Sequence, residues 1–220
     1  IECTPPPGTG TQPVSLRVNG KVSSDNETFY EYVEPMISRV SPAAGGLFGG
    51  DELVISGNFL GTDTAKPVIT VGGQVCIAPV VDIPHRQVKC VVPVSKGPGK
   101  VDVVVAVNGV RSNLTAFSKY DYVDSVVNTV EPREGPTYGG VELTISGHML
   151  GVQGRVPKVF VGELQCSDVE LVSNSVLKCT SPRGTPGDAS VKVMYGGVYG
   201  TEGKNLYKFV GPEVGMVVPA

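Results

Sequence analysis

The sequence predicts an all-β protein built from tandem immunoglobulin-like β-sandwiches. Three observations support this fold class: a repeat of about 90 residues, a composition rich in Gly, Pro and Val, and hydrophobic positions that alternate with a period of two. The chain has 220 residues with 29 Gly and 18 Pro, which suits short strands joined by turns and suits long helices poorly. A unit of this length with several short strands is typical of an immunoglobulin-type sandwich.

The clearest repeated element is a strand that follows two glycines. Residues 48–61 read FGGDELVISGNFLG, and residues 137–151 read TYGGVELTISGHMLG. In each copy one residue separates two apolar positions, so one face of the strand is expected to be buried. These positions are Leu53, Ile55, Leu143 and Ile145. A Gly-Gly turn that feeds an alternating strand forms one compact β unit.

Other strands recur at the same spacing. An aromatic strand reads FYEYV, KYDYV and LYKFV in its three copies, and we expect its tyrosines to pack in a core or between domains. The segments KPVITVGGQVC and VPKVFVGELQC also match, with Ile69, Val71, Val159 and Val161 as inward positions. A strand of alternating Val, residues 101–107, then runs into an Asn-Gly turn, which is a strong hairpin signal.

The repeats predict four segments along the chain. Residues 1–34 match the C-terminal half of a unit, residues 35–123 and 124–210 match complete units, and residues 211–220 match the first strand of a further unit. Half a sandwich leaves its apolar face open to water, so we expect the chain to belong to a longer array. The boundaries are short, and neighbouring units should sit end to end with limited freedom.

Each complete unit carries two cysteines about a dozen residues apart, which predicts disulfides Cys76–Cys90 and Cys166–Cys179. Cys3 matches the second member of such a pair, and its partner is expected upstream of residue 1. Paired cysteines in short loops favour an oxidising compartment. Buried reduced thiols in a cytosolic protein are the alternative. A metal site is not predicted, because C-x₂-C spacing is absent.

Two N-x-[ST] sequons predict N-linked glycans at Asn26 and Asn113. Both follow an Asn-Gly turn and precede the aromatic strand, so the glycans would project from the same part of successive units. The last unit has no sequon there. It carries Tyr195 and Tyr199 around a hairpin tip instead, and exposed aromatics on such a tip form a candidate contact loop.

The composition also argues against several functions. A net charge of −3 with scattered Lys and Arg gives no footprint for nucleic acid. No apolar run is long enough to cross a bilayer, so any membrane anchor or export signal is expected outside this chain. His85 and His148 are placed in loops, and no nucleophile or carboxylate pair is held beside a base. We therefore expect no enzyme activity and no cofactor.

The units resemble the IPT/TIG domain. The resemblance rests on the pattern Y-x-Y/F-V-x-P followed by G-G-x-x-L-x-I-x-G, the cysteine pair and the closing aromatic strand, and it covers the whole chain. It implies E-set sandwiches of the kind found in plexin and Met-type ectodomains and in fibrocystin-like ciliary surface proteins. Related domains without the disulfide occur in Rel-type transcription factors.

The resulting hypothesis is a structural or adhesive segment of a large extracellular, cell-surface glycoprotein. Its repeats would act as a stiff spacer and contact other protein domains, including neighbouring repeats and copies of the chain itself. The alternatives are a ligand-binding receptor ectodomain of the plexin or Met kind and an intracellular E-set module. A ciliary or flagellar location follows only from the fibrocystin-like resemblance.

Overall fold

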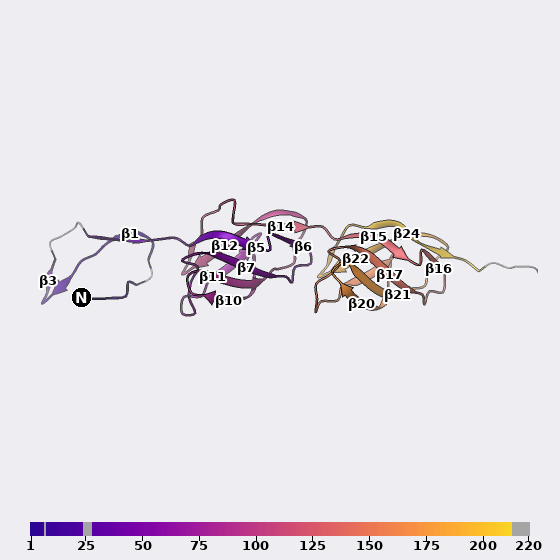
Figure 1. The fold of residues 1–220 in the computed structure, drawn as a ribbon, viewed down its shortest axis with the longest axis horizontal. Coiled ribbons are helices and arrows are strands. Elements are labelled where there is room, and N and C mark those ends of the chain that lie inside the picture. The colour runs from indigo at the N-terminus through magenta and orange to yellow at the C-terminus, as the bar shows by residue number, and fades with distance from the viewer. Residues whose placement is uncertain (7, 24–27, 213–220) are drawn as a thin grey trace, which may run out of the picture. The chain divides into compact units, whose positions relative to one another are not determined.

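The computed structural model describes residues 1–6, 8–23 and 28–212, and all regular secondary structure within these ranges is β (Figure 1). The predicted all-β class is therefore confirmed. The strand predicted within residues 211–220 falls largely outside the described residues.

The N-terminal part forms two small antiparallel pairs. Strand β1 (Gly10–Pro13) pairs with β4 (Phe29–Tyr32), and β2 (Arg17–Val18) pairs with β3 (Lys21–Val22). Nearly all their side chains are exposed, in line with an apolar face that lacks a covering sheet.

Residues 36–123 form the first sandwich, which consists of two sheets. The four-stranded sheet has the order β10 (Ile77–Ile83), β11 (Gln87–Val91), β7 (Glu52–Asn58), β5 (Met36–Ser41). The six-stranded sheet has the order β6 (Ala44–Gly46), β14 (Lys119–Val123), β12 (Gly99–Val107), β8 (Val68–Val71), β9 (Gln74–Val75), with β13 (Val110–Arg111) on β12.

Residues 126–210 form the second sandwich with the same topology. Its four-stranded sheet has the order β15 (Val126–Glu131), β17 (Glu142–His148), β21 (Val176–Thr180), β20 (Ser167–Ser173). Its six-stranded sheet has the order β16 (Glu134–Pro136), β24 (Gly203–Val210), β22 (Gly187–Tyr195), β18 (Lys158–Val161), β19 (Leu164–Gln165), with β23 (Val198–Tyr199) on β22.

The predicted inward positions lie in the cores. All eight of them are buried: Leu53, Ile55, Ile69, Val71, Leu143, Ile145, Val159 and Val161. Each alternates with a more exposed neighbour, so burial follows the period of two that the sequence shows. On β12 only the middle valines, Val103 and Val105, are fully enclosed, and the two end positions are half-buried.

The repeated Gly-Gly pairs have a structural reason. Gly49 and Gly139 both adopt positive φ, at 57° and 75°. A Cβ at Gly49 would lie 2.4 Å from the Pro93 carbonyl oxygen, and a Cβ at Gly139 would lie 2.4 Å from that of Pro182. The first glycine of each pair is thus required both by its backbone conformation and by the close approach of the segment after β11 or β21.

The aromatic strands also have a common geometry. Tyr120 and Tyr122 pack edge to face with centroids 5.0 Å apart, and Tyr30 and Tyr32 do so at 4.8 Å. Tyr122 donates a hydrogen bond to the Pro93 carbonyl at 2.9 Å. Tyr32 likewise donates to the carbonyl of Pro6 at 2.7 Å. This match supports the predicted kinship of residues 1–34 with the C-terminal half of a unit.

Candidate functional site

The candidate site residues predicted from the sequence lie in three parts of the structure. The first part contains the cysteines. Cys76 directly follows β9 of the six-stranded sheet, and Cys90 lies on β11 of the four-stranded sheet. The two form a disulfide with Cα atoms 5.8 Å apart, and both are buried. The bond therefore joins the two sheets of the first sandwich through its core.

The second predicted pair, Cys166 and Cys179, is not bonded in the structure. Cys166 and Cys179 occupy the equivalent positions, but the structure has them as free, buried thiols. A hydrogen bond with Cys166 raises the pKa of the Cys179 thiol, and burial raises it further. The Cys179 thiol is therefore held in its protonated form inside the apolar core.

Cys3 is an exposed free thiol. Its predicted partner lies outside the chain, and that pairing remains a prediction.

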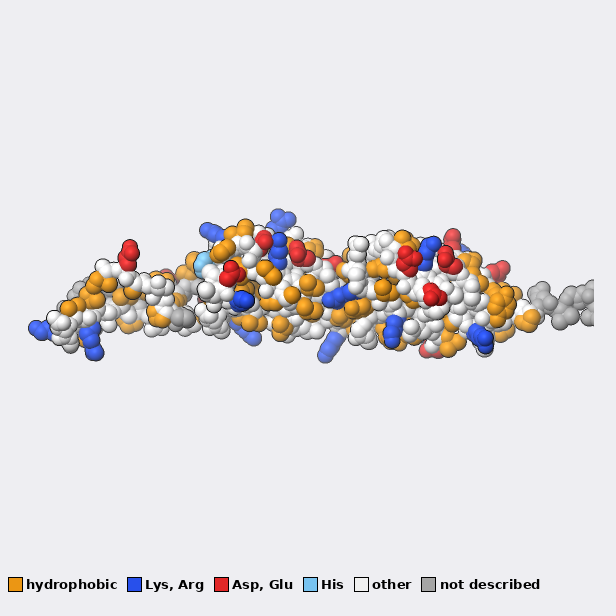
Figure 2. Space-filling model, turned by 90° about the horizontal axis from the view of Figure 1, so that it is seen from below, with side chains coloured by type: hydrophobic (Ala, Val, Ile, Leu, Met, Phe, Trp, Pro, Cys, Tyr) orange, Lys and Arg blue, Asp and Glu red, His pale blue; other side chains and the backbone are white. Residues whose placement is uncertain are grey.

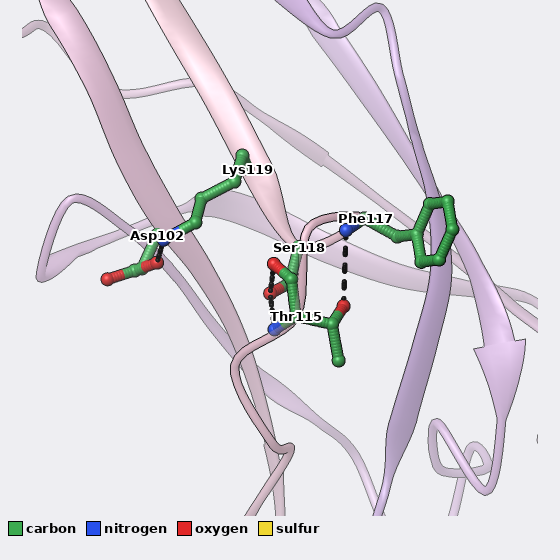
Figure 3. A network of polar contacts seen from close by, with 5 residues as sticks. All are labelled: Asp102, Thr115, Phe117, Ser118 and Lys119. Carbon is green, nitrogen blue, oxygen red and sulfur yellow. Dashed lines mark hydrogen bonds and ion pairs between the residues drawn. The ribbon is translucent and has the colours of Figure 1, made fainter.

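The second candidate place is the loop between β13 and β14, which carries the Asn113 sequon (Figure 3). Asn113 itself is exposed, as are Leu114 and Phe117. Two buried serines hold the loop at its ends. The Val105 N–H donates to Ser112 Oγ at 3.1 Å, and the Thr115 N–H donates to Ser118 Oγ at 2.8 Å.

The sequon threonine takes part in this loop. Thr115 Oγ1 accepts a hydrogen bond from the Phe117 N–H at 3.2 Å, and the Ser118 hydroxyl donates to the Thr115 carbonyl at 3.0 Å (Figure 3). Lys119 pairs with Asp102 beside the loop. The result is an ordered loop that presents the Asn113 amide to solvent. The two anchoring serines were not predicted, although the Thr-x-x-Ser spacing is a local signal for such a turn.

Asn26, the other predicted glycan site, lies outside the described residues.

The third candidate place is the hairpin formed by β22 and β23, whose turn residues Gly196 and Gly197 have positive φ. Tyr199 pairs with Met194 and is 52% exposed, with its ring 6.1 Å from that of Phe160. Tyr195 pairs with Val198 and is half-buried, with the Arg155 guanidinium 5.6 Å from its ring centre. Adjacent cross-strand pairs point to opposite faces. The two tyrosines therefore do not form one contact loop as predicted.

The segment before β15 is held against the second sandwich. The Thr201 N–H donates to the Ser125 carbonyl at 2.6 Å, and the Thr201 hydroxyl donates to the Asp124 carboxylate. Ser125 is buried. Two residues, Asp124 and Ser125, separate β14 from β15, and both are thus fixed by contacts on the C-terminal side.

The described residues hold no group of three or more His, Cys, Asp or Glu able to bind a metal ion, and no helix long and apolar enough to cross a membrane. A groove of about 570 Å³ on the second sandwich is lined by Glu163, Arg183 and Asp188, with neither His nor Cys among its lining residues. His85 and His148 are exposed.

Charges of both signs are interspersed on the face shown in Figure 2. Among the described residues, opposite charges pair: Lys178 lies 3.2 Å from Glu142, and Lys192 lies 3.2 Å from Glu163. Exposed pairs of this kind contribute little stability. The face in Figure 2 carries no single-sign field of the kind that attracts a polyanion.

Each sandwich consists of two sheets packed around a core, and both sandwiches have the same topology. This architecture defines a chain of tandem immunoglobulin-like modules. The IPT/TIG domain model matches residues 35–119 and residues 125–209. The chain therefore belongs to the IPT/TIG domain family, whose domains are typically binding or structural modules. The resemblance found in the sequence is confirmed.

Solved structures to which this chain is similar include the plexin A4 extracellular region, at 23% identity and TM-score 0.46, with 80% of this chain and 18% of that chain covered. Another is the SGBP-B protein from a xyloglucan utilization locus of Bacteroides uniformis, at 16% identity and TM-score 0.35, with coverage of 79% and 49%. A third is the Yersinia pseudotuberculosis adhesin InvE, at 12% identity and TM-score 0.30, with coverage of 80% and 60%. The chain thus spans less than two thirds of each of these proteins.

Proposed function

We propose that this chain is a structural and adhesive segment of a large extracellular, cell-surface glycoprotein, with its repeats serving as a stiff spacer and a surface for protein contacts. The observation that carries the proposal is the repeated sandwich with a short, hydrogen-bonded connection. An extracellular setting is further supported by the Cys76–Cys90 disulfide, because such bonds persist in oxidising compartments.

The spacer role rests on the connection at Asp124 and Ser125. A connection of two residues leaves little chain to act as a hinge. Its Ser125 carbonyl and Asp124 carboxylate are both bonded to Thr201, so the second sandwich holds both connecting residues and little free chain is left to bend.

Small-angle X-ray scattering on the full chain tests the spacer. We expect a narrow distribution of end-to-end distances, and Thr201→Ala should broaden it. Insertion of a Gly-Ser-Gly-Ser linker after Val123 provides a freely jointed control. Indistinguishable scattering from the native chain and the linker variant would refute the stiff spacer and leave the family assignment intact.

The glycoprotein part rests on Asn113. A glycan at this exposed amide would extend from an ordered loop, and we expect expression in a secretory host to give a glycosidase-sensitive mass. Thr115→Ala should remove the mass of the Asn113 glycan, whereas Thr115→Ser should keep it because the sequon is retained. An unmodified native chain from the secretory host would refute occupancy.

A further inference from the structure

The edge strand β10 of the first sandwich carries three exposed large apolar side chains. Ile77, Val80 and Ile83 are 48%, 57% and 49% exposed. We refer to these three residues as the β10 strip. Large apolar side chains in a row on a sheet edge form a template for pairing with another chain.

The second sandwich indicates that these three residues share one face. On its edge strand β20, Ser167, Glu170 and Ser173 lie opposite Thr180, Lys178 and Val176 of β21. Each step of three residues on β20 thus matches a step of two on β21, as expected for a bulge. The partners on β21 alternate with the buried Leu177 and Cys179, so this row lies on the outer face of the sheet.

The sequence match extends this register to β10. Each edge strand starts immediately after the first cysteine of its unit, so Ile77, Val80 and Ile83 match Ser167, Glu170 and Ser173 in order. Ala78 and Asp168 both have a positive φ, at 49° and 50°. The match and the shared φ thus assign the β10 strip to the outer face of its sheet.

The fold does not require apolar residues in this row, because the second sandwich has serine, glutamate and serine there. Two neighbouring outward positions differ in the same sense. Val54 and Val91 stand in the first sandwich where Thr144 and Thr180 stand in the second, although Gln87 stands where the second has Val176. With the same topology in both sandwiches, the apolar residues of the β10 strip itself belong to the first sandwich and point to a contact there.

We propose that the β10 strip is a self-association surface at which a second copy of the chain docks antiparallel about a two-fold axis near Val80. The apolar positions are symmetric about Val80, so the two-fold axis sets Ile77 of one copy against Ile83 of the other. Within the described residues no strand pairs with β10 on the side away from β11, which leaves that edge accessible.

Charge also suits a second copy. The one charged residue of β10 is Asp82, and it is paired with Lys89 of β11 at 3.2 Å. In the antiparallel arrangement Asp82 lies opposite Ala78 of the other copy, so like charges do not meet. Pro79 has no N–H, which limits backbone pairing to a short stretch and leaves the side chains as the main contact.

The proposed glycan does not block this surface. Asn113 follows β13, which belongs to the six-stranded sheet, whereas β10 belongs to the four-stranded sheet of the same sandwich. The inference deepens the contact role under the proposed function and rests on it. The spacer is tested separately, because a rigid chain that stays monomeric would overturn only the self-association.

Sedimentation equilibrium of the full chain tests the proposal. A small interface of this kind predicts a dimer dissociation constant between about 10 µM and 1 mM. The variant I77S/V80E/I83S installs the residues of the second sandwich and should raise the constant at least tenfold. The control V68T/V75T removes two equally exposed apolar side chains from the other sheet and should leave it unchanged. A native chain that is monomeric at 1 mM, or an equal effect of the control, overturns the proposal.

A crosslink provides a second readout that does not depend on the triple variant folding. In a Cys3→Ser background, Val80→Cys should form a disulfide-linked dimer under mild oxidation, because the two copies meet at this residue. Val75→Cys should not. Equal crosslinking at both positions would place the contact elsewhere and overturn the proposal.

Discussion

Removing the Cys76–Cys90 bond should lower the stability of the first sandwich far more than removing the equivalent thiols lowers that of the second. The perturbation is the double substitution C76A/C90A, and its counterpart is C166A/C179A. Both delete the same atoms from equivalent core positions, yet only the first pair is bonded. The difference between them therefore isolates the covalent link from the loss of packing.

The magnitude follows from the loop that the bond closes. Its cysteines are 14 positions apart, and a closed loop of this size restricts the unfolded chain by about 3 kcal/mol. For a domain of this length, each 1 kcal/mol shifts the melting temperature by roughly 4–8 °C. We therefore expect a difference of about 12–24 °C between the effects of the two substitutions.

Differential scanning calorimetry of the full chain, in a Cys3→Ser background that prevents intermolecular exchange, measures this difference. The transition of the first sandwich should fall by the larger amount. Intact mass after alkylation under denaturing conditions counts the disulfides in each preparation, so that only chains with the expected bond are compared. Equal decreases for the two double variants would refute the reasoning.

Three further predictions follow from buried groups. Gly49→Ala should destabilise the first sandwich by about 1–3 kcal/mol in urea unfolding, because a Cβ would meet the Pro93 carbonyl, whereas Gly73→Ala, with open space around it, should cost less. Burial raises the pKa of Tyr122 from 10.0 to about 12, so the folded state holds this proton more tightly. The stabilisation that this raised pKa gives the folded state is complete below pH 10 and should be lost as the pH rises towards 12. Urea midpoints should fall over that window less steeply in Tyr122→Phe. A maleimide should label the exposed Cys3 in the native chain and reach the buried Cys179 only after denaturation; native labelling of Cys179 would contradict its burial.

The repeat alone was enough to predict the fold class and the buried positions of the central strands. Leu53 and Leu143 are buried where a period of two puts them, since alternation and core burial are the same signal seen in sequence and in structure. The glycines that mark the repeat are also explained locally, by a positive φ and a close carbonyl at Gly49 and Gly139. Features that a few neighbouring residues determine could thus be predicted from the sequence.

Features that depend on how strands and loops pair in space could not be predicted from the sequence. Tyr195 and Tyr199 are four residues apart, and only the pairing of β22 with β23 reveals that they point to opposite faces. The spacing of the cysteines is nearly the same in both units, so it could not show that Cys166 and Cys179 are free whereas Cys76 and Cys90 are bonded. Ser112 and Ser118 act through backbone groups brought together by the fold of their loop. In each case the deciding contact is absent from the local pattern.

The β10 strip shows how a repeat can serve as its own control. Alignment of the two units by sequence places Val80 opposite Glu170 without saying whether either residue is exposed. The structure adds that Ala78 and Asp168, the second residues of the two edge strands, share a positive φ and that Val80 is 57% exposed. Because the polar version of this edge folds within the same chain, stability of the sandwich does not account for the apolar one. What remains to account for it is a contact made outside the sandwich, and its symmetry about one residue is what a second copy of the same strand would match.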